Sequence, residues 1–238
     1  MKVIILAGGS GRRLAIDGES LPKPLIPIGG KPMLWHIMGI FACQGFNEFV
    51  LCLGYKADTI TGAVMGFDEV KNGTWKVEPV DTGIDSPKLE RLRRVFNRLP
   101  EGANIICYAD NLCDINLPEL IKHHSDSGKM FTITGVRPTS PYGHIFNDDG
   151  RLKFKEKPVM QNSLINAGFM VFEKSFTGYV MRMEGELETD VISSLADEGQ
   201  LNVYRHSGGW NGVNNLKEYD EVCDIYEKGN AFWEIWKK

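Results

Sequence analysis

Several features that mark large classes of protein are missing from this sequence. It has no excess of positive charge, because 31 acidic residues outnumber 27 basic ones and leave a formal net charge of −4. A chain of this charge lacks the basic field that gathers nucleic acid or an anionic membrane. The apolar run at residues 3–7 falls far short of the roughly 20 residues of a membrane span, and no secretory signal pattern surrounds it. We therefore expect a cytoplasmic protein without nucleic-acid or membrane partners.

Paired cysteines are absent as well. The five cysteines stand apart among apolar residues and never form a C-x-x-C pair, which argues against a zinc knuckle and a redox pair. Reduced, mostly buried thiols are the expected state, as in cytosolic proteins. The sequence also lacks a recognisable Ser/His/Asp or Cys/His arrangement. Nothing in the pattern points to covalent catalysis.

What the sequence does have is an alternation of β-branched runs and helical patterns. This order predicts an α/β fold with a mixed, mostly parallel sheet covered on both faces. Asp149-Gly150 signals a hairpin turn in the strand-rich second half, and Asn116 and Asn215 each precede a glutamate by three residues, as in helix caps. The expected strands are 2–7, 48–54, 75–80, 104–109, 129–136, 143–147, 151–157 and 164–172, and the expected helices are 32–45, 88–99, one beginning after Asn116, and a closing one over 214–236.

The chain length favours a single domain. A chain of 238 residues can bury one full core, and it contains no repeat, low-complexity tract or Pro/Gly/Ser linker. We expect one domain made of two halves, over about 1–115 and about 116–238.

A cationic, glycine-rich loop follows the first predicted strand. Residues 6–14 read LAGGSGRRL, and residues 1–31 hold five basic side chains against two acidic ones. Glycine lets backbone N–H groups approach an anion, and arginine adds a fork of donors. The P-loop pattern is absent, and Leu14 stands where the dinucleotide fingerprint needs its third glycine. The loop therefore predicts a phosphate site of another kind, or a plain strand-to-helix turn. Asp110 ends another predicted strand, and ligands of open α/β sheets bind beyond such strand ends.

The longer pattern LAGGSGRRL…LPKPLIPIGGKPMLWHI resembles the sugar-phosphate nucleotidyltransferases, whose start is L-A-G-G-x-G-x-R-L followed by P-K-P. The segments CLGYK, VDTG, FKEKP and INAGFMVF extend the resemblance along the chain and narrow it to the glucose-1-phosphate cytidylyltransferases. The resemblance implies a Rossmann-like single-domain fold, CTP and glucose 1-phosphate as substrates, Mg²⁺ as cofactor, and a homo-oligomer. The nucleotide-binding residues that it implies are Leu6, Ala7, Gly8, Gly9, Gly11, Arg12, Arg13, Lys23, Thr82 and Gly83.

The same resemblance assigns roles in the reaction. Arg13 and Lys23 match the basic residues that hold the nucleotide's phosphates, and Asp110 matches the metal-binding aspartate. Mg²⁺ favours carboxylate and phosphate oxygens. Without the family pattern, Asp110 reads equally well as a turn or capping residue. The second metal ligand of the family is an aspartate, and Asn214 takes its place here. Asn214 keeps an oxygen ligand but loses one negative charge, or else belongs only to a helix start.

The resemblance also implies a nucleotide-binding half over about 1–115 and an acceptor-binding half over about 116–238. By family pattern Lys157 neutralises the acceptor's phosphate and Glu156 accepts from its hydroxyls, while Tyr142 and Gly143 line the pocket. The alternative for this stretch is an edge strand with solvated lysines. Asn166 interrupts an apolar strand, where a buried amide needs a hydrogen-bond partner. That partner is an acceptor hydroxyl in the family, and a backbone group across the strand is the alternative.

One further departure concerns the base. The family places a Gly-Gly pair close to the cytosine, and Leu89 and Glu90 occupy those positions. Three functions stay open on the sequence alone. The leading one is cytidylyl transfer from CTP to a sugar 1-phosphate. The second is nucleotidyl transfer to another phosphorylated or phosphonate acceptor, or from another NTP. The third is a catalytically silent relative that binds nucleotide or sugar phosphate.

Overall fold

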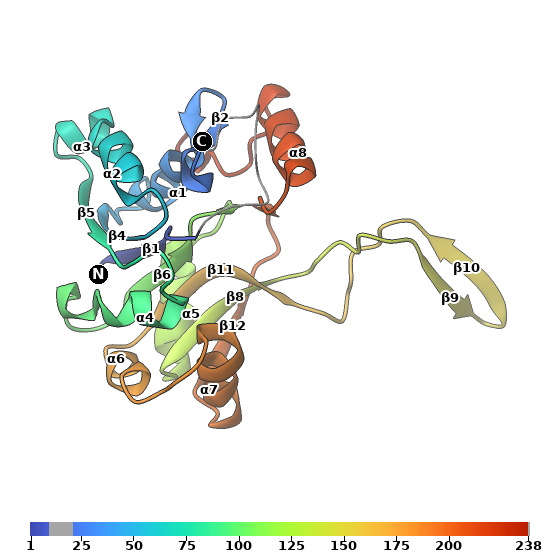
Figure 1. Ribbon diagram of the computed structural model, residues 1–238. Helices are drawn as coiled ribbons and strands as arrows, with labels where there is room; N and C mark the ends of the chain where they lie inside the picture. Colours follow the sequence, from blue (N-terminus) through green and yellow to red (C-terminus); the bar gives the residue numbers. More distant parts are fainter. Residues whose placement is uncertain (10–20, 238) are drawn as a thin grey trace.

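The computed structural model describes residues 1–9 and 21–237, and its centre is a seven-stranded sheet (Figure 1). Strand β11 is antiparallel to both of its neighbours, and every other pairing in the sheet is parallel. This confirms the predicted mixed, mostly parallel sheet. The strands in spatial order are β12 (Leu201–Arg205), β8 (Phe131–Val136), β11 (Ile165–Phe172), β6 (Asn104–Tyr108), β1 (Val3–Leu6), β4 (Glu48–Leu53) and β5 (Lys76–Asp81).

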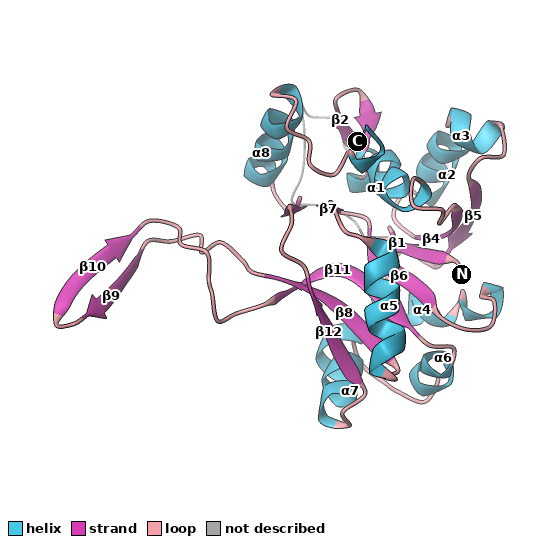
Figure 2. Cartoon of the chain, turned by 180° about the vertical axis from the view of Figure 1, so that it is seen from behind, coloured by secondary structure: helices cyan, strands magenta, loops and turns pink. Residues whose placement is uncertain are grey.

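Two apolar cores lie on opposite faces of the sheet, as Figures 1 and 2 show for the helices that cover them. Alternate residues of a strand point to opposite faces, so Val3 and Ile5 enter one core and Ile4 enters the other. The first core is covered by α1 (Met33–Ala42), α2 (Ala57–Met65), α5 (Leu117–Ser127) and α8 (Leu216–Glu227), and the second by α4 (Lys88–Arg93), α6 (Ser175–Val180), a π-helical turn (Leu187–Ile192) and α7 (Ser193–Asp197).

Two predicted helix starts are confirmed. The Asn116 side chain accepts a hydrogen bond from Glu119 N at 3.1 Å, and the Asn215 side chain accepts one from Glu218 N at 3.0 Å. Two predicted helix ends are wrong. The helix expected over 88–99 stops at Arg93 and continues as a 3₁₀ turn (Phe96–Arg98). The closing helix stops at Glu227, because Gly229 adopts a φ of +70°, and a 3₁₀ turn (Ile235–Lys237) follows.

The C-terminal segment packs under α1 through aromatic residues. Trp233 is fully buried, and its indole Nε1–H donates to Nδ1 of the buried His36 at 3.3 Å. The other ring nitrogen, Nε2, lies 2.9 Å from Ile28 O and therefore carries the proton. Both nitrogens of a neutral imidazole are thus satisfied. Burial lowers the pKa of His36, against a smaller opposite effect of the Ile28 carbonyl.

The smaller strands and helices were not predicted. Strand β7 (Asn111–Cys113) pairs antiparallel with β13 (Trp210–Gly212), and β2 (Pro27–Ile28) pairs with β3 (Lys31–Pro32). The remaining helical turns are a 3₁₀ turn (Lys23–Leu25) and α3 (Asp68–Lys71). In the described part of the chain, no helix combines the length and the apolar character needed to cross a membrane.

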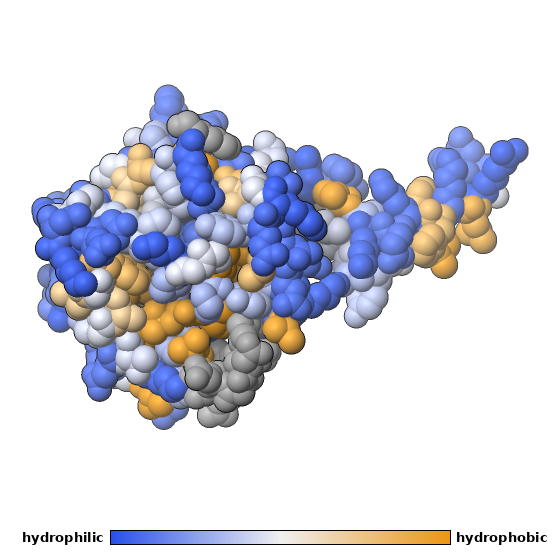
Figure 3. Space-filling model, turned by 90° about the horizontal axis from the view of Figure 1, so that it is seen from above, coloured by the Kyte–Doolittle hydropathy of each residue, from blue (hydrophilic) through white to orange (hydrophobic). Residues whose placement is uncertain are grey.

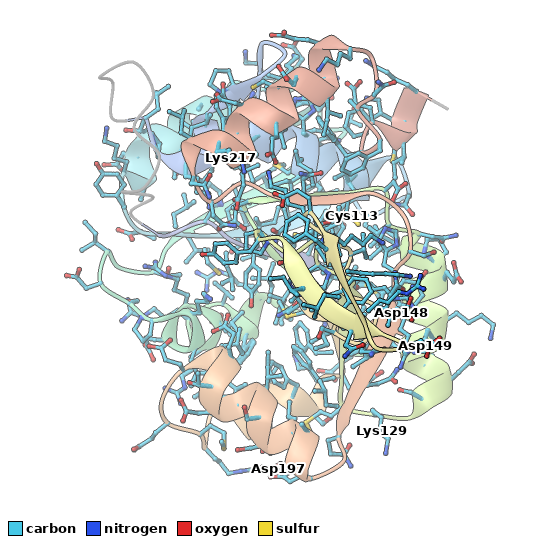
Figure 4. All side chains as sticks on the ribbon, turned by 90° about the vertical axis from the view of Figure 1, so that its right-hand side faces the viewer. Cys113, Lys129, Asp148, Asp149, Asp197 and Lys217 are labelled. Carbon is cyan, nitrogen blue, oxygen red and sulfur yellow. The ribbon has the colours of Figure 1, made fainter. Side chains whose placement is uncertain are left out.

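A hairpin projects from the body, formed by β9 (His144–Asp148) and β10 (Arg151–Lys155) (Figures 1 and 2). Its turn is the predicted Asp149-Gly150, and both residues have positive φ, at 49° and 80°, as a two-residue hairpin turn requires. Figure 4 looks along the hairpin toward the body, with Asp148 and Asp149 at the turn.

One face of this hairpin is apolar. Ile145 lies opposite Phe154 in the strand register, and Leu152 is two residues from Phe154 on the same face. Their exposed fractions are 73%, 66% and 79%, respectively. The same projecting arm carries apolar groups in Figure 3. An isolated two-stranded hairpin is marginally stable in water, so a face of this kind is suited to contact another surface.

Candidate active site

A cavity of about 820 Å³ opens beyond the carboxyl ends of β1 and β6, the position expected for a ligand in an open α/β sheet. Its volume is within the usual range for small-molecule sites. The cavity is lined by Leu6, Ala7, Gly8, Gly9, Lys23, Pro24, Ser86, Pro87, Lys88, Arg91, Tyr108, Ala109, Asp110, Asn111, Asn166, Glu186, Trp210 and Asn214.

Lys23 joins the two predicted metal ligands. Its Nζ donates to Asp110 Oδ2 at 2.5 Å and to Asn214 Oδ1 at 3.5 Å. Asp110 follows β6, and the antiparallel β7–β13 pair returns the chain to its side, where Val213 N donates to Asp110 O at 2.9 Å. Asp110 and Asn214 are more than a hundred positions apart in the sequence, yet the carboxylate of one and the amide oxygen of the other both contact the Lys23 ammonium group.

This donor set suits a divalent cation. Mg²⁺ takes hard oxygen ligands and is commonly held by one or two protein groups together with substrate phosphates. The oxygens of Asp110 and Asn214 already share one cation, the Lys23 ammonium. The residues therefore fit Mg²⁺, provided that Lys23 moves toward an incoming phosphate.

The glycine loop is held in place by Arg91, a residue that the sequence analysis did not single out. The Arg91 side chain is 5% exposed and donates to four carbonyl oxygens and one hydroxyl. A Cβ atom on Gly8 would lie 2.1 Å from Arg91 Nη1, so Gly8 must remain without a side chain. The acceptors are Gly8 O, Leu53 O, Gly83 O, Ile84 O and Thr82 Oγ1, at 2.8–3.1 Å. Arg91 thereby ties the ends of three chain segments to the cavity floor.

Arg91 left a weak signal in the sequence. It is a charged residue between Leu89 and Leu92, both of which are buried. A buried arginine requires several acceptors, and the glycines of the loops after β1 and β4 allow those carbonyls to approach. Only the fold brings these loops together, so the spacing along the chain could not identify the acceptors.

The structure also locates the two residues that replace the family's Gly-Gly pair. Leu89 is 1% exposed and packs into the second core. Glu90 pairs with Arg94 at 3.0 Å and with Arg93 at 3.5 Å. Neither residue lines the cavity, whose wall here is Ser86, Pro87 and Lys88. Both side chains therefore point away from the cavity wall.

A second polar cluster, also unpredicted, stands across the cavity. The Tyr108 hydroxyl donates to Glu188 Oε1 at 2.6 Å, and Lys88 forms an ion pair with the same oxygen. The Lys88 ammonium lies 4.9 Å from the centre of the Tyr108 ring. Burial raises the pKa of Tyr108, and so does the neighbouring Glu188, so the phenol remains a donor. Burial favours the neutral form of Glu188, but the hydrogen bonds from Lys88 and Tyr108 outweigh it and lower the pKa of that carboxyl.

Asn166 lies in the cavity wall at a bulge of β11. Its Oδ1 accepts a hydrogen bond from Gly168 N at 2.9 Å, and its Nδ2 lies 3.8 Å from Met170 Sδ. The oxygen thus has a backbone partner, in its own strand and not across it. Gly168 has a φ of +84° where the register shifts, which turns the Asn166 side chain toward the cavity.

The other predicted residues are distributed as follows. Leu6, Ala7, Gly8 and Gly9 line the cavity, whereas Thr82 and Gly83 lie behind it as partners of Arg91. Gly11, Arg12 and Arg13 fall outside the described residues. Apart from Asn166, the predicted acceptor residues are not in the cavity lining and lie at the base of the projecting hairpin: Tyr142, Gly143, Glu156 and Lys157.

Comparison with known proteins agrees with this architecture. The profile of the family described as "Nucleotidyl transferase" matches residues 2–229. The chain therefore belongs to the nucleotidyl transferase family. A glucose-1-phosphate cytidylyltransferase of Salmonella typhi is 32% identical to it over 100% of both chains. A mannose-1-phosphate guanyltransferase of Aspergillus oryzae is 29% identical over 95% of this chain and 64% of its own length.

Solved structures support the fold. HddC from Yersinia pseudotuberculosis superposes with a TM-score of 0.72 over 94% of this chain and 99% of its own, at 21% identity. The predicted family and the Rossmann-like α/β fold are confirmed. Within the family, the chain is similar over its whole length to glucose-1-phosphate cytidylyltransferases.

Proposed function

We propose that this protein transfers a cytidylyl group from CTP to the phosphate of a sugar 1-phosphate, most simply glucose 1-phosphate, and releases pyrophosphate. The observation that carries the proposal is the cluster of Lys23, Asp110 and Asn214 in the same cavity as Gly8 and Gly9. It combines a phosphate-binding cation with oxygen ligands for a metal. The similarity to cytidylyltransferases over the full chain supports the choice of CTP.

In this reaction, an oxygen of the acceptor's phosphate attacks the α-phosphorus of CTP. A new P–O bond forms, the bond from that phosphorus to the bridging β-phosphate oxygen breaks, and pyrophosphate takes up the electron pair. Two anions have to meet, so positioning and charge neutralisation supply most of the rate. A bound Mg²⁺ would be held by Asp110 and Asn214 and would neutralise charge on the phosphates.

The chain's own residues prepare these steps. Lys23 is the cation nearest to Asp110 in the cavity and would exchange that carboxylate for a phosphate oxygen. Arg91 fixes the Gly8 peptide, so that the loop backbone is in place before a ligand arrives. Arg13 on the nucleotide, and Glu156 and Lys157 on the acceptor, complete the proposed set. In this proposal the nucleotide-binding residues lie in the first half of the chain, over about 1–115, and the acceptor-binding residues lie in the second half, over about 116–238.

We also propose a cytoplasmic homo-oligomer. The exposed apolar face of the hairpin, formed by Ile145, Leu152 and Phe154, supports assembly between copies. It also gives a reason why the predicted acceptor residues at the hairpin base lie apart from the cavity, since contact with another copy would reposition this arm.

The deciding experiment is a matrix of four NTPs against phosphorylated acceptors in the presence of Mg²⁺, with pyrophosphate release as the readout. Turnover with CTP and glucose 1-phosphate alone is the expected result. Turnover with another NTP, sugar phosphate or phosphonate would establish the second function, for which the Asn214 replacement is the specific argument. If no pair reacts while CTP or a sugar phosphate raises the melting temperature, the protein is a silent binder.

A further inference from the structure

A second cavity, of about 490 Å³, lies beyond the carboxyl ends of β8 and β12. Among the described residues, Trp210 alone lines both this cavity and the first one. Strands β8 and β12 are parallel neighbours, with Arg205 opposite Gly135, and their ends form the same kind of edge that locates the first cavity. The lining is Val136, Arg137, Val159, Gln161, Leu164, Arg205, His206, Ser207, Gly208 and Trp210.

Two arginines in this lining have no acidic partner. Arg137 follows β8 and Arg205 ends β12, and neither forms an ion pair or a side-chain hydrogen bond with another residue of 1–9 or 21–237. Arg91, Arg93, Arg94 and Arg98 all have acceptors for their guanidinium groups. Both Arg137 and Arg205 are exposed residues of the cavity lining, and a guanidinium group without an acceptor is available to a planar anion such as phosphate or carboxylate.

One residue of the cavity lining, His206, is held by the carboxylate of Asp114, which is not itself in the lining. His206 Nε2 lies 2.9 Å from Asp114 Oδ1, and because the carboxylate only accepts, the imidazole nitrogen donates. A Cβ atom on Gly208 would lie 2.2 Å from Asp114 Oδ1 and 2.8 Å from His206 Cε1. The loop therefore closes on this pair only with glycine at 208. Asp114 thereby orients a residue of this second cavity.

A divalent cation is a poorer match for this place. Cys113, Asp114 and His206 bring three possible ligand atoms within 4.8 Å of one another. Burial raises the pKa of the Cys113 thiol, which keeps it protonated and weakens it as a ligand. Two unpaired arginines would also oppose a cation.

The geometry points to a second anion site that takes a small phosphorylated molecule, with its phosphate on Arg137 and Arg205 and its organic part against the apolar wall. Val136, Val159, Leu164 and Trp210 supply that wall, and the volume is within the range of small-ligand sites. Two sources share this chemistry. The phosphate belongs either to the acceptor of the proposed reaction, bound here before its phosphate passes Trp210 to reach the first cavity, or to a separate small phosphate that binds without reacting.

The first measurement is calorimetric titration of inorganic phosphate into the full chain. We expect Arg137→Gln and Arg205→Gln each to weaken phosphate binding by about tenfold or more, because each loses a charge-assisted hydrogen bond. Arg137→Lys and Arg205→Lys should retain part of the affinity. Arg151→Gln, at an exposed arginine of the hairpin that lines neither cavity, is the matched control and should bind as the unchanged protein does. Melting temperatures without phosphate verify that the variants fold.

Three results would overturn the site: no phosphate binding by the unchanged protein, equal binding by both arginine-to-glutamine variants, or an equal loss in Arg151→Gln. Loss of binding in Lys23→Gln alone would assign the phosphate to the first cavity and also refute the inference. None of these results depends on turnover, so a failure of the proposed function leaves the binding measurement valid.

Steady-state kinetics then separate the two sources. If the acceptor's phosphate occupies the site, the Arg137→Gln and Arg205→Gln variants raise the acceptor KM about tenfold with kcat nearly unchanged, and inorganic phosphate competes with the acceptor. If a separate phosphate occupies it, the acceptor KM stays the same and inorganic phosphate does not compete. Either outcome supports the site and names its ligand.

Discussion

The cavity floor around Asp110 and the arm that carries Lys157 are built in opposite ways. The floor is made of strand ends and loops that a buried arginine ties together, and its charged groups are already paired. The arm is two strands with an apolar face in solvent and no core of its own. Under the proposed function, we expect nucleotide binding to be prepared within one chain and acceptor binding to depend on a contact between the arm and another copy.

Replacement of Asp110 should have the largest effect on activity. Asp110→Asn keeps the shape but removes the carboxylate that contacts Lys23 and would hold the metal. We expect kcat/KM to fall at least about a thousandfold, as for other groups that stabilise charge in a transition state. Asp148→Asn, at an exposed position of the hairpin, is the control. If Asp110→Asn keeps its turnover, Asp110 is not required to bind the metal.

Arg91 tests the rigidity of the floor. Arg91→Ala leaves the buried Thr82 hydroxyl and four carbonyls without their donor, and we expect it to lower the free energy of unfolding by about 3 kcal/mol. Arg91→Lys keeps a charge but not the fork of donors, so it should recover only part of the loss. Urea denaturation gives both values. The control is Arg98→Ala, at a surface arginine beside Glu78, which should lower the free energy of unfolding by less than about 1 kcal/mol.

Substitutions on the apolar face of the hairpin should change the oligomeric state of the protein and not the stability of its fold. Leu152→Asn with Phe154→Ser removes most of the apolar face. If copies assemble through this face as proposed, sedimentation velocity should show the double variant as a monomer at concentrations where the unchanged protein is assembled. Lys153→Ser, on the opposite face of β10, is the control. Equal sedimentation of all three proteins would mean that the face does not hold the copies together. A monomeric double variant with unchanged acceptor KM would refute the dependence of acceptor binding on the arm.

The same contrast explains what the sequence could predict. Strand positions near the sheet centre follow from β-branched runs, and the caps at Asn116 and Asn215 follow from local spacing, because these features depend on nearby residues. The family pattern named Lys23, Asp110 and Asn214, and they line one cavity. Arg91, and the Lys88–Tyr108–Glu188 cluster, were missed because their partners come from distant segments. The helix expected over 88–99 breaks after Arg93, although its apolar spacing continues.

A smaller effect is expected on stability as pH falls. Burial lowers the pKa of His36 from 6.5, so the unfolded chain takes up a proton near that pH before the folded chain does. Stability should therefore decrease as pH falls below about 6.5, by up to about 1.4 kcal/mol per pH unit until the folded state also protonates. Protonation of Nδ1 would remove the bond from Trp233. Urea midpoints of the unchanged protein and His36→Gln between pH 7 and 5 measure this, with exposed His123→Gln as the control. Parallel pH profiles of the unchanged protein and His36→Gln would rule out His36 as the cause.

The smallest and most specific effect should come from Asn214→Asp. Asn214 Oδ1 lies 3.5 Å from the Lys23 ammonium, and Asp110 Oδ2 lies 2.5 Å from it. A second carboxylate here adds a negative charge beside the proposed metal, so the Mg²⁺ concentration for half-maximal activity should fall several-fold, roughly as expected for about 1 kcal/mol. Asn215→Asp changes the neighbouring residue, a helix cap that aspartate also satisfies, and controls for charge alone. If Asn214→Asp leaves the Mg²⁺ requirement where it was, Asn214 is no ligand. In that case Asp110 and the substrate phosphates would hold the metal without Asn214. The replacement of the family's aspartate by Asn214 would then affect the contact with Lys23 and not the metal.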